Sequence, residues 1–291
     1  MRKKINTFLF CCLFSLHFAS GQTFVRVLGM EDPDLSTSLM VVPSFQIPDS
    51  TYLRVTYKYS FVTDTTLKNK KSRDILQLEI GHKVSKFYSE RMRINDSIYK
   101  ESIENNKGFR LEDNYYPQGY EIFKYPYQSN ILVTNRLPLT ENIYTYTDSI
   151  SDLKWEILPE KAKYQDYKCQ KAKTHFRGRD YIALFTTDIP CNNGPWKFCN
   201  LPGLILKVSD KDNFFVFEAI SVLNANMPIK QYNWKSKSIN KDTWYKMERS
   251  CHEKAGVYLK THNINLRKFN KNGEVTNLPD DWTVPYNPIE R

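Results

Sequence analysis

The sequence of 291 residues contains none of the common catalytic or cofactor-binding motifs. It has no G-x-S-x-G nucleophile turn, no H-E-x-x-H zinc motif, no Walker A loop and no G-x-G-x-x-G sequence that opens a helix. These absences exclude the familiar forms of serine hydrolases, zinc proteases, P-loop nucleotidases and dinucleotide-dependent enzymes. The sequence therefore predicts no catalytic residue, no metal and no cofactor.

Alanine is scarce, with seven residues, whereas aromatic residues are abundant, with 19 Tyr, 17 Phe and 5 Trp. Alanine favours helices and aromatic residues favour strands, so this ratio argues against a helical bundle. The hydrophobic share of 41% and the charged share of 25% are ordinary for a globular protein. The composition therefore favours a folded chain that is mainly β.

Long hydrophobic runs are missing except near the N-terminus, where Arg2, Lys3 and Lys4 precede an apolar run from 8 to 19. This run is too short to span a bilayer and is typical of a secretory signal peptide. Small residues at Ala19 and Gly21 predict cleavage after Gly21. We therefore expect residues 1–21 to be a signal peptide and 22–291 to form a single domain. Cys11 and Cys12 lie inside the apolar run, which argues against a lipid-modified cysteine.

Strong charge of one sign is also missing. Removal of the signal peptide lowers the formal net charge from +10 to +7, with 39 basic against 32 acidic side chains. The densest basic cluster, around Lys70 and Arg73, lies in a polar stretch typical of a solvated loop. This pattern predicts no nucleic-acid partner, and no later segment is apolar enough to predict a transmembrane helix.

Four cysteines remain after cleavage: Cys169, Cys191, Cys199 and Cys251. An even number in an exported protein suggests disulfides, although buried free thiols are the alternative. The turn-rich residues between Cys191 and Cys199 make this pair the easiest to close, which leaves Cys169 and Cys251 as the second candidate pair. No spacing typical of zinc ligands occurs.

Alternation of apolar and polar residues predicts several strands joined by short turns. Residues 53–61 alternate with a period of two, and residues 75–80 and 84–87 form a predicted hairpin around Gly81-His82. Residues 89–118 are polar, and their pattern is compatible with a loop that contains a helix. Short strands at 131–133, 143–146 and 155–158 have the spacing of a meander.

The region 155–222 carries the densest pattern and is the expected core of the domain. Strands at 167–176 and 181–186 flank the residues Arg177-Gly178-Arg179-Asp180, whose glycine suits a tight turn, and strands at 204–208 and 214–222 flank a polar turn. The Leu201-Pro202-Gly203-Leu204 sequence fits a type II turn. The resulting prediction is a mainly β fold, an antiparallel curved sheet, sandwich or half-barrel built from hairpins.

One late amphipathic helix is predicted within 240–291. Asn240 can cap it, Trp244, Met247 and Cys251 share one face, and Gly256 would end it. The proline-rich residues 270–291 should then form an extended tail.

One segment resembles the signature of the GLPGLI family, a group of exported bacterial envelope proteins. The residues that carry the resemblance are Gly194, Pro195, Trp196, Lys197, Phe198, Cys199, Asn200, Leu201, Pro202, Gly203, Leu204 and Ile205. Asn200 stands where the signature has its first glycine, and asparagine also tolerates left-handed backbone. Similarities at 75–81, 85–89, 167–172, 178–179, 189–190 and the Asn287-Pro288-Ile289-Glu290 ending extend the resemblance over most of the mature chain.

The resemblance implies a GLPGLI-like domain exported through the Sec pathway to the periplasm, the outer membrane or the exterior. It implies no established activity and no catalytic residues. An accessory role beside TonB-dependent outer-membrane receptors is one implied association. The partner could then be an envelope protein, a peptide or a lipid.

Four residues are candidate binding residues. Turns on both sides could display Trp196 and Phe198 as anchors, although the same turns could pack them into the core. Arg177 and Arg179 on a hairpin tip could bind an anion, or form an ordinary polar turn. The leading hypothesis is a non-enzymatic binding or accessory protein of the envelope.

Two other hypotheses stay open. One is a hydrolase that uses Asp188, His175 or His252 in an undeclared site, and the other is a structural component of the outer membrane. Two titratable groups within hydrogen-bond reach in a cleft would favour the enzyme.

Overall fold

The computed structural model describes residues 40–105, 118–125, 128–264, 267–269 and 275–291. The predicted signal peptide, its cleavage site and the first two cysteines lie outside these residues. The strands are β1 (Phe45–Phe61), β2 (Ser72–Ile80), β3 (Ser85–Ser89), β4 (Tyr120–Lys124), β5 (Asn130–Arg136), β6 (Ile143–Ser149), β7 (Glu156–Tyr164), β8 (Tyr167–Phe176), β9 (Arg179–Thr186), β10 (Leu204–Asp210), β11 (Phe215–Tyr232), β12 (Ser236–Ser238), β13 (Arg267–Phe269) and β14 (Val275–Asn277). The helices are α1 (Glu90–Glu104), α2 (Lys241–Glu253) and α3 (Ala255–Thr261).

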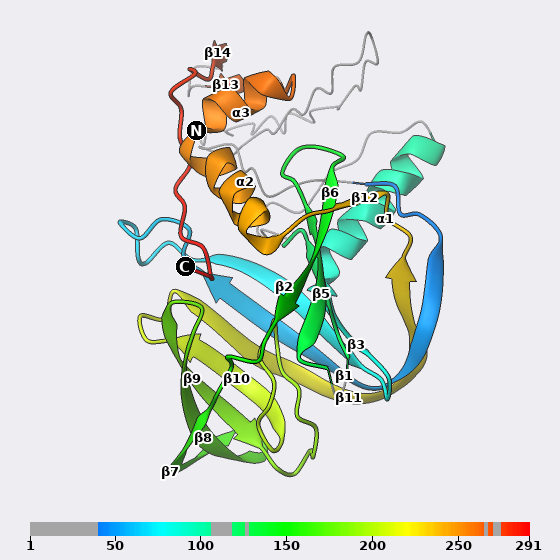
Figure 1. Cartoon of the computed structure of the whole chain (residues 1–291), viewed down its shortest axis with the longest axis vertical. Coiled ribbons are helices and arrows are strands. Elements are labelled where there is room, and N and C mark those ends of the chain that lie inside the picture. Colours follow the sequence, from blue (N-terminus) through cyan, green and yellow to red (C-terminus); the bar gives the residue numbers. More distant parts are fainter. Residues whose placement is uncertain (1–39, 106–117, 126–127, 265–266, 270–274) are drawn as a thin grey trace, which may run out of the picture.

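Twelve strands form one open sheet in the order β12-β6-β5-β4-β3-β2-β1-β11-β10-β9-β8-β7, while β13 and β14 pair separately (Figure 1). The described pairs are antiparallel apart from β12 with β6, which is parallel. The prediction of a mainly β fold is therefore confirmed.

The two longest strands, β1 and β11, lie side by side at the centre of the sheet. In β1 the side chains of Leu53, Val55 and Tyr57 are buried, and the polar residues between them face the other side. This alternation follows from the pleat, which points successive side chains to opposite faces. The strand predicted at 53–61 is confirmed and begins earlier, at Phe45.

The predicted hairpins β2–β3, β8–β9 and β10–β11 are confirmed by their antiparallel registers. Arg177 and Gly178 join β8 to β9 with φ values of 51° and 74°. Two positive φ values are the mark of a type I′ turn, whose twist matches that of the flanking strands.

The predicted meander is correct for β5 and β6, which pair, but wrong for β7. The chain after β6 crosses to the far edge of the sheet, where β7 pairs with β8. Side-chain bonds to backbone carbonyls hold this crossing: Trp155 Nε1 donates to Cys199 O at 2.7 Å, and Thr174 Oγ1 donates to Lys154 O at 2.6 Å.

The described residues form three helices, whereas the sequence predicted one late helix and allowed either a loop or a helix at 89–118. The segment left open at 89–118 begins with α1, whose first turn is capped by Ser89 Oγ, an acceptor from Met92 N at 3.0 Å. Asn240 caps α2 as expected. Gly256 does not end that helix: it lies in α3, where a Cβ would fall 2.2 Å from Pro279 O.

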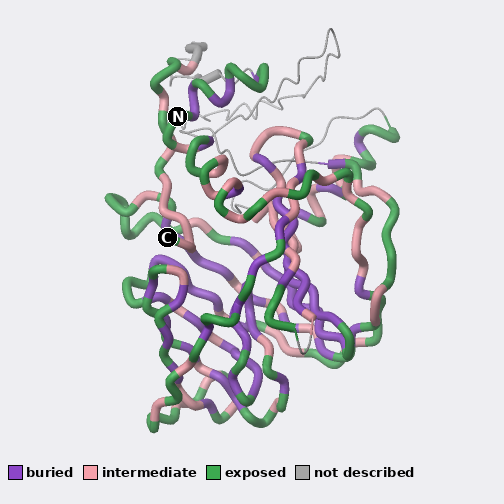
Figure 2. Tube along the Cα trace, in the orientation of Figure 1, coloured by how far each residue is buried: buried purple, intermediate pink, exposed green. Residues whose placement is uncertain are grey.

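Buried residues follow the strands of the curved sheet (Figure 2), and the core that they form on one of its faces is rich in aromatic residues. Tyr59 and Phe217 stack with centroids 4.3 Å apart, and Tyr181 meets Phe198 at 4.8 Å. Curvature brings the two ends of the sheet together, because Arg177 at the β8–β9 turn contacts Asp148 of β6 at 3.1 Å. This contact gives the open sheet the character of a half-barrel.

Candidate functional site

The signature loop lies inside the core. Trp196 is 2% exposed and Phe198 is fully buried, and each ring meets aromatic neighbours such as Phe176, at 5.9 Å from Trp196. Burial supports the packing interpretation of these two residues. The interpretation of Trp196 and Phe198 as displayed anchors needs correction, because neither ring presents a surface to a partner in this conformation.

The loop backbone differs from the predicted type II turn. That turn requires a positive φ at Gly203, but Gly178 is the glycine with positive φ among the described residues. Gly203 is needed for another reason, since a Cβ there would lie 2.0 Å from Thr186 O. Left-handed backbone occurs instead at Trp196, with φ of 49°, and at Asn200, with φ of 69°.

Two buried lysines hold the signature loop. Lys124 Nζ donates to Gly194 O at 2.7 Å and to Phe198 O at 3.3 Å, and burial lowers the pKa of Lys124 to about 8. Lys197, 1% exposed, donates to Asp148 at 2.7 Å and pairs with Glu290. Burial disfavours the charge of Lys197, but Glu290, Tyr146 and Asp148 outweigh burial and raise its pKa.

The C-terminal tail locks onto the same region. Arg179 Nη2 donates to Asn287 Oδ1 and to Pro288 O, both at 2.6 Å, and Asn287 Nδ2 donates to Val62 O at 2.7 Å. Arg177 pairs with Asp148. The interpretation of Arg177 and Arg179 as an anion-binding tip therefore needs correction, because the protein's own acidic and carbonyl oxygens occupy both guanidinium groups.

Cys169, Cys191, Cys199 and Cys251 are free and buried in the structure, so the predicted bridges are absent among the described residues. Cys199 forms an isolated antiparallel bridge with Asn193, which places it opposite that residue rather than opposite Cys191. Cys191 Sγ instead accepts a long bond from Tyr52 Oη at 3.8 Å. Burial raises the pKa of both thiols.

The residues considered for a hydrolase stand apart. His175 pairs with Asp180 at 2.7 Å on an exposed hairpin, while His252 lies on α2 against Glu248 O and the ring of Tyr286. Asp188 is exposed in the turn after β9. The described residues hold no group of three or more His, Cys, Asp or Glu side chains that could bind a metal ion.

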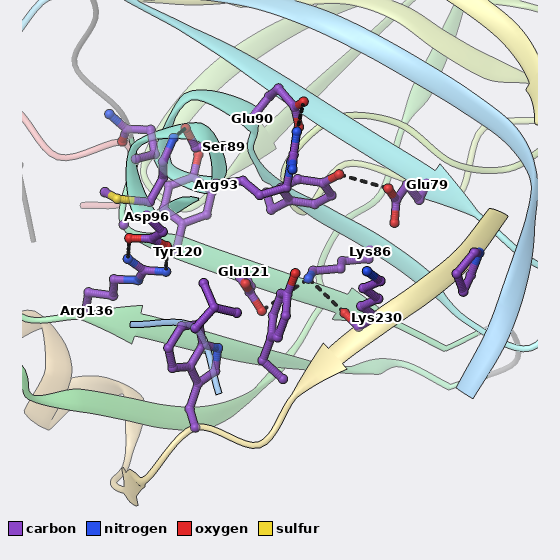
Figure 3. A pocket seen from close by; sticks show the side chains of 18 of the residues that line it. Glu79, Lys86, Ser89, Glu90, Arg93, Asp96, Tyr120, Glu121, Arg136 and Lys230 are labelled. Carbon is purple, nitrogen blue, oxygen red and sulfur yellow. Dashed lines mark hydrogen bonds and ion pairs between the residues drawn. The ribbon is translucent and has the colours of Figure 1, made fainter. Parts of the chain in front are cut away.

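A pocket with a cavity of about 320 Å³ lies on the face of the sheet opposite the core. We call it the α1–β11 pocket, because α1 and the last part of β11 form its walls above β2, β3 and β4 (Figure 3). Leu78 and Phe87 face the core, so their neighbours Glu79, Lys86 and Tyr88 face the pocket. The half-buried residues Tyr232 and Trp234 complete the lining, while Tyr120, which also borders it, packs its ring on the core side against Phe87 at 6.4 Å.

The α1–β11 pocket brings titratable groups such as Tyr88 and Glu79 within hydrogen-bond reach, the arrangement that would favour the enzyme hypothesis. Most of its charges are, however, satisfied by partners within the protein. Arg93 makes two hydrogen bonds to Glu90, at 3.0 and 2.7 Å. Arg136 likewise makes two bonds to Asp96, at 2.8 and 2.6 Å, and lies 4.9 Å from the centre of the Trp234 ring. These fork-shaped pairs fix the guanidinium groups along the wall of the pocket.

Lys86 is the most deeply buried cation of the pocket, with 4% of its side chain exposed. Its Nζ donates to Lys230 O at 2.8 Å and lies 4.6 Å from the ring centre of Tyr232 and 4.8 Å from that of Tyr88. Glu121 Oε2 is 3.5 Å away and accepts no hydrogen bond within the protein. Lys86 and Glu121 are thus a close but incompletely bonded pair.

Burial raises the pKa of three carboxyl groups at or behind the pocket. Burial raises the pKa of Glu79 although Tyr88 Oη donates to it at 2.8 Å. Burial also raises the pKa of Asp96 despite its pair with Arg136. Asp74, behind the pocket, is the strongest case, since burial raises its pKa to about 7 against bonds from Gln118 N, Ser89 Oγ and Ile75 N.

Asp74 makes the stability of the fold depend on pH. Its folded pKa of about 7 exceeds its ordinary 3.8, so the folded state keeps a proton that the unfolded state has lost between these values. We therefore expect the free energy of unfolding to fall as pH rises from about 4 to 7. Asp74→Asn should flatten this slope in urea titrations, whereas Asp281→Asn, on the exposed tail, should leave it unchanged. An equal slope in Asp74→Asn would contradict the expectation.

Sequence reasoning missed this pocket. Its charged residues lie at polar positions of alternating strands, which are typical of any solvated face. The available signal was the cross-strand pairing of opposite charges, such as Glu79 with Lys86, together with Tyr88 opposite Glu121. Burial of that face by α1 and the end of β11 could not be read from the strands themselves.

Fold and site together define an open, mainly β protein with a buried signature loop and a lined pocket on the opposite face. Residues 143–207, from β6 into β10, match the family model described as "Protein of unknown function (Porph_ging)". No curated protein matches the chain. No helix in the described part of the chain has the length and apolar character that crossing a membrane demands.

Two solved structures, titled "Structure of PNGF-II in P21 space group" and "Structure of PNGF-II in C2 space group", are similar over 68% of this chain. The sequence identities are 16% and 17%, and the TM-scores are 0.46 and 0.45. The similar region spans 33% and 32% of those chains, so this protein corresponds to about a third of their length.

Proposed function

We propose that the protein is an exported, non-enzymatic binding protein of the cell envelope and that the α1–β11 pocket holds its ligand. The observation that carries this proposal is the preformed cavity of about 320 Å³ with aromatic walls and fixed polar groups. Ligand sites are concave, largely apolar and supplied with a few positioned polar groups, with volumes from about 300 Å³ upward.

Burial of charge supports this assignment. Lys86 and Asp96 are nearly inaccessible, and burying such groups costs free energy unless each is paired and hydrogen-bonded. Glu121 lines the cavity, and its buried Oε2 lies 3.5 Å from Lys86 Nζ without a hydrogen bond within the protein. A ligand that donates to the Glu121 carboxylate would offset that cost.

Export and family membership belong to the same proposal. Export rests on the signal-peptide pattern of residues 1–21, and GLPGLI membership rests on the signature at 194–205. The stretch matched by the Porph_ging model contains this signature. A periplasmic or outer-membrane location follows, and a TonB-dependent receptor is the proposed neighbour that the ligand would serve.

Methyl NMR tests whether the pocket binds small molecules. Met92 and Met227 line the α1–β11 pocket, while Met247 lies on α2, a helix outside its lining. With ¹³C-methyl methionine in the mature protein, fragments that bind should shift the signals of Met92 and Met227 and leave Met247 unchanged. A fragment library that shifts neither pocket methyl, or that shifts Met247 alone, would overturn the proposal.

A further inference from the structure

The unused hydrogen-bonding capacity of the α1–β11 pocket indicates its ligand chemistry. An ammonium group has three donors, but Lys86 Nζ uses one at ordinary distance, to Lys230 O. Its 3.5 Å separation from Glu121 Oε2 is longer than ordinary N–H···O bonds. The ammonium of Lys86 and the carboxylate of Glu121, whose Oε2 is itself buried, therefore lie side by side among the residues that line the cavity, as Figure 3 shows.

Charge balance argues against a strongly charged ligand. Five basic and four acidic side chains line the pocket: Arg54, Lys86, Arg93, Arg136 and Lys230 against Glu79, Glu90, Asp96 and Glu121. Carboxylates already hold Arg93 and Arg136 in two-bond pairs, so an anion would have to displace them. A cation beside Glu121 would face the ammonium of Lys86 at close range.

A neutral hydroxyl group matches the unused hydrogen-bonding capacity of Lys86 and Glu121. It accepts a hydrogen bond and donates one at the same time, so one hydroxyl can accept from Lys86 Nζ and donate to the carboxylate of Glu121, a side chain that is 14% exposed. Both bonds involve an ionised partner and belong to the stronger class of hydrogen bonds. Glu79 offers a second carboxylate, and Tyr88 already directs its hydroxyl at one of the two oxygens of that group.

The aromatic lining fits the other half of such a ligand. Rings of Tyr232 and Trp234 present apolar surface beside the polar pair. A ligand with hydroxyls at its edge and C–H groups on its faces would satisfy both kinds of wall. Saccharide rings have this amphipathic form, and a cavity of about 320 Å³ is at the small end of ligand pockets.

Resting on the proposed binding function, we propose that the α1–β11 pocket binds a small neutral saccharide, one hydroxyl of which bridges Lys86 and Glu121. Lys86 and Glu121 select for the hydroxyl, and the aromatic walls hold the ring. The pairs Arg93–Glu90 and Arg136–Asp96 keep the remaining wall rigid and its charge neutral.

A matched set of sugars tests the ligand class. The neutral probes are glucose, galactose, mannose, N-acetylglucosamine, lactose and cellobiose, and the charged probes are glucosamine and glucuronate. We expect at least one neutral probe to shift the Met92 and Met227 methyl signals, and both charged probes to bind at least tenfold more weakly than that sugar. A charged probe that binds as tightly, or a panel without any neutral binder, overturns the saccharide proposal.

Paired variants test the residues. Lys86→Met with Glu121→Gln removes both members of the pair, which avoids leaving one buried charge alone. This double variant should bind the neutral sugar at least tenfold more weakly, while Lys58→Met with Glu218→Gln, a separate ion pair at 3.7 Å outside the pocket lining, should bind normally. Should the double variant fail to fold, Glu121→Gln alone must show the loss. Unchanged affinity in the folded variant overturns the bridging role.

The two proposals fail in different ways. If fragments shift Met92 and Met227 but no neutral sugar does, the pocket is a ligand site and the saccharide proposal is wrong. If neither fragments nor sugars shift these signals, the binding function itself is wrong.

Discussion

Lys197→Met should lower the free energy of unfolding by about 3–5 kcal/mol, the cost typical of breaking a buried ion pair from one side. Lys197 is 1% exposed and is held by Asp148 and Glu290. Methionine fills similar volume but removes the charge, so Glu290 would lose its ammonium partner in the interior. Urea unfolding followed by intrinsic fluorescence and circular dichroism measures the change.

Lys207→Met is the matched control for this prediction. Lys207 pairs with Glu218 at 2.9 Å but is 35% exposed, and solvent-exposed pairs contribute about 1 kcal/mol or less. We expect its unfolding midpoint to stay near that of the wild type. A loss in Lys197→Met no larger than in Lys207→Met would show that the buried pair does not hold the signature loop.

A second substitution separates lost packing from stranded charge. Adding Glu290→Gln to Lys197→Met removes the carboxylate that has lost its ammonium partner and keeps the longer contact of its Oε2 with Arg177 Nε, at 3.5 Å. The double variant should recover part of the stability lost by Lys197→Met, because the two side chains are coupled and their effects are not additive. Additive losses would instead indicate that packing alone explains the effect.

Local pattern was enough to predict the strands and several turns. The alternation at 53–61, the tight turn at Arg177-Gly178 and the cap at Asn240 each depend on neighbours in sequence. The pleat, the twist of a hairpin and the first turn of a helix are properties of a few consecutive residues. Predictions of this kind therefore held.

Contacts between distant residues could not be predicted in the same way. Lys197 meets Asp148, 49 residues earlier, and Glu290, 93 residues later, and nothing in its own segment marks it as a buried ion. Cys191 and Cys199 are close in sequence, yet the backbone of Cys199 pairs with Asn193 in an isolated β-bridge, so Cys199 lies opposite Asn193 and not opposite Cys191. Burial and pairing across the sheet decide these features, and both depend on the complete fold.

The candidate site shows the same division. The strands that carry Glu79 and Lys86 were predicted, but their polar face was not expected to be covered. Two elements cover this polar face. One is α1, in a segment for which the sequence allowed either a helix or a loop, and the other is the end of β11, which extends ten residues beyond its predicted end at 222. The pocket exists because those two elements meet over a face that the sequence pattern assigns to solvent.

Gly203→Ala adds a single methyl group to the signature loop, and we expect it to lower the stability of the protein strongly. The new Cβ would lie 2.0 Å from Thr186 O, and this carbonyl belongs to the backbone of β9, which pairs with Leu204 next to the glycine. Neither strand can withdraw without breaking the pairing, so we expect a loss of about 3 kcal/mol or more in the free energy of unfolding.

Gly119→Ala is the control that isolates close backbone approach from the general effect of replacing glycine. Its Cβ would meet the Cβ of Arg136 at 3.4 Å, an ordinary contact, so its stability should change by about 0.5 kcal/mol or less. Neither glycine has the positive φ that would itself strain an alanine. Thermal and urea unfolding of the two variants should therefore differ widely, and equal stabilities would show that the signature glycine serves some purpose other than the approach of β9 to the loop.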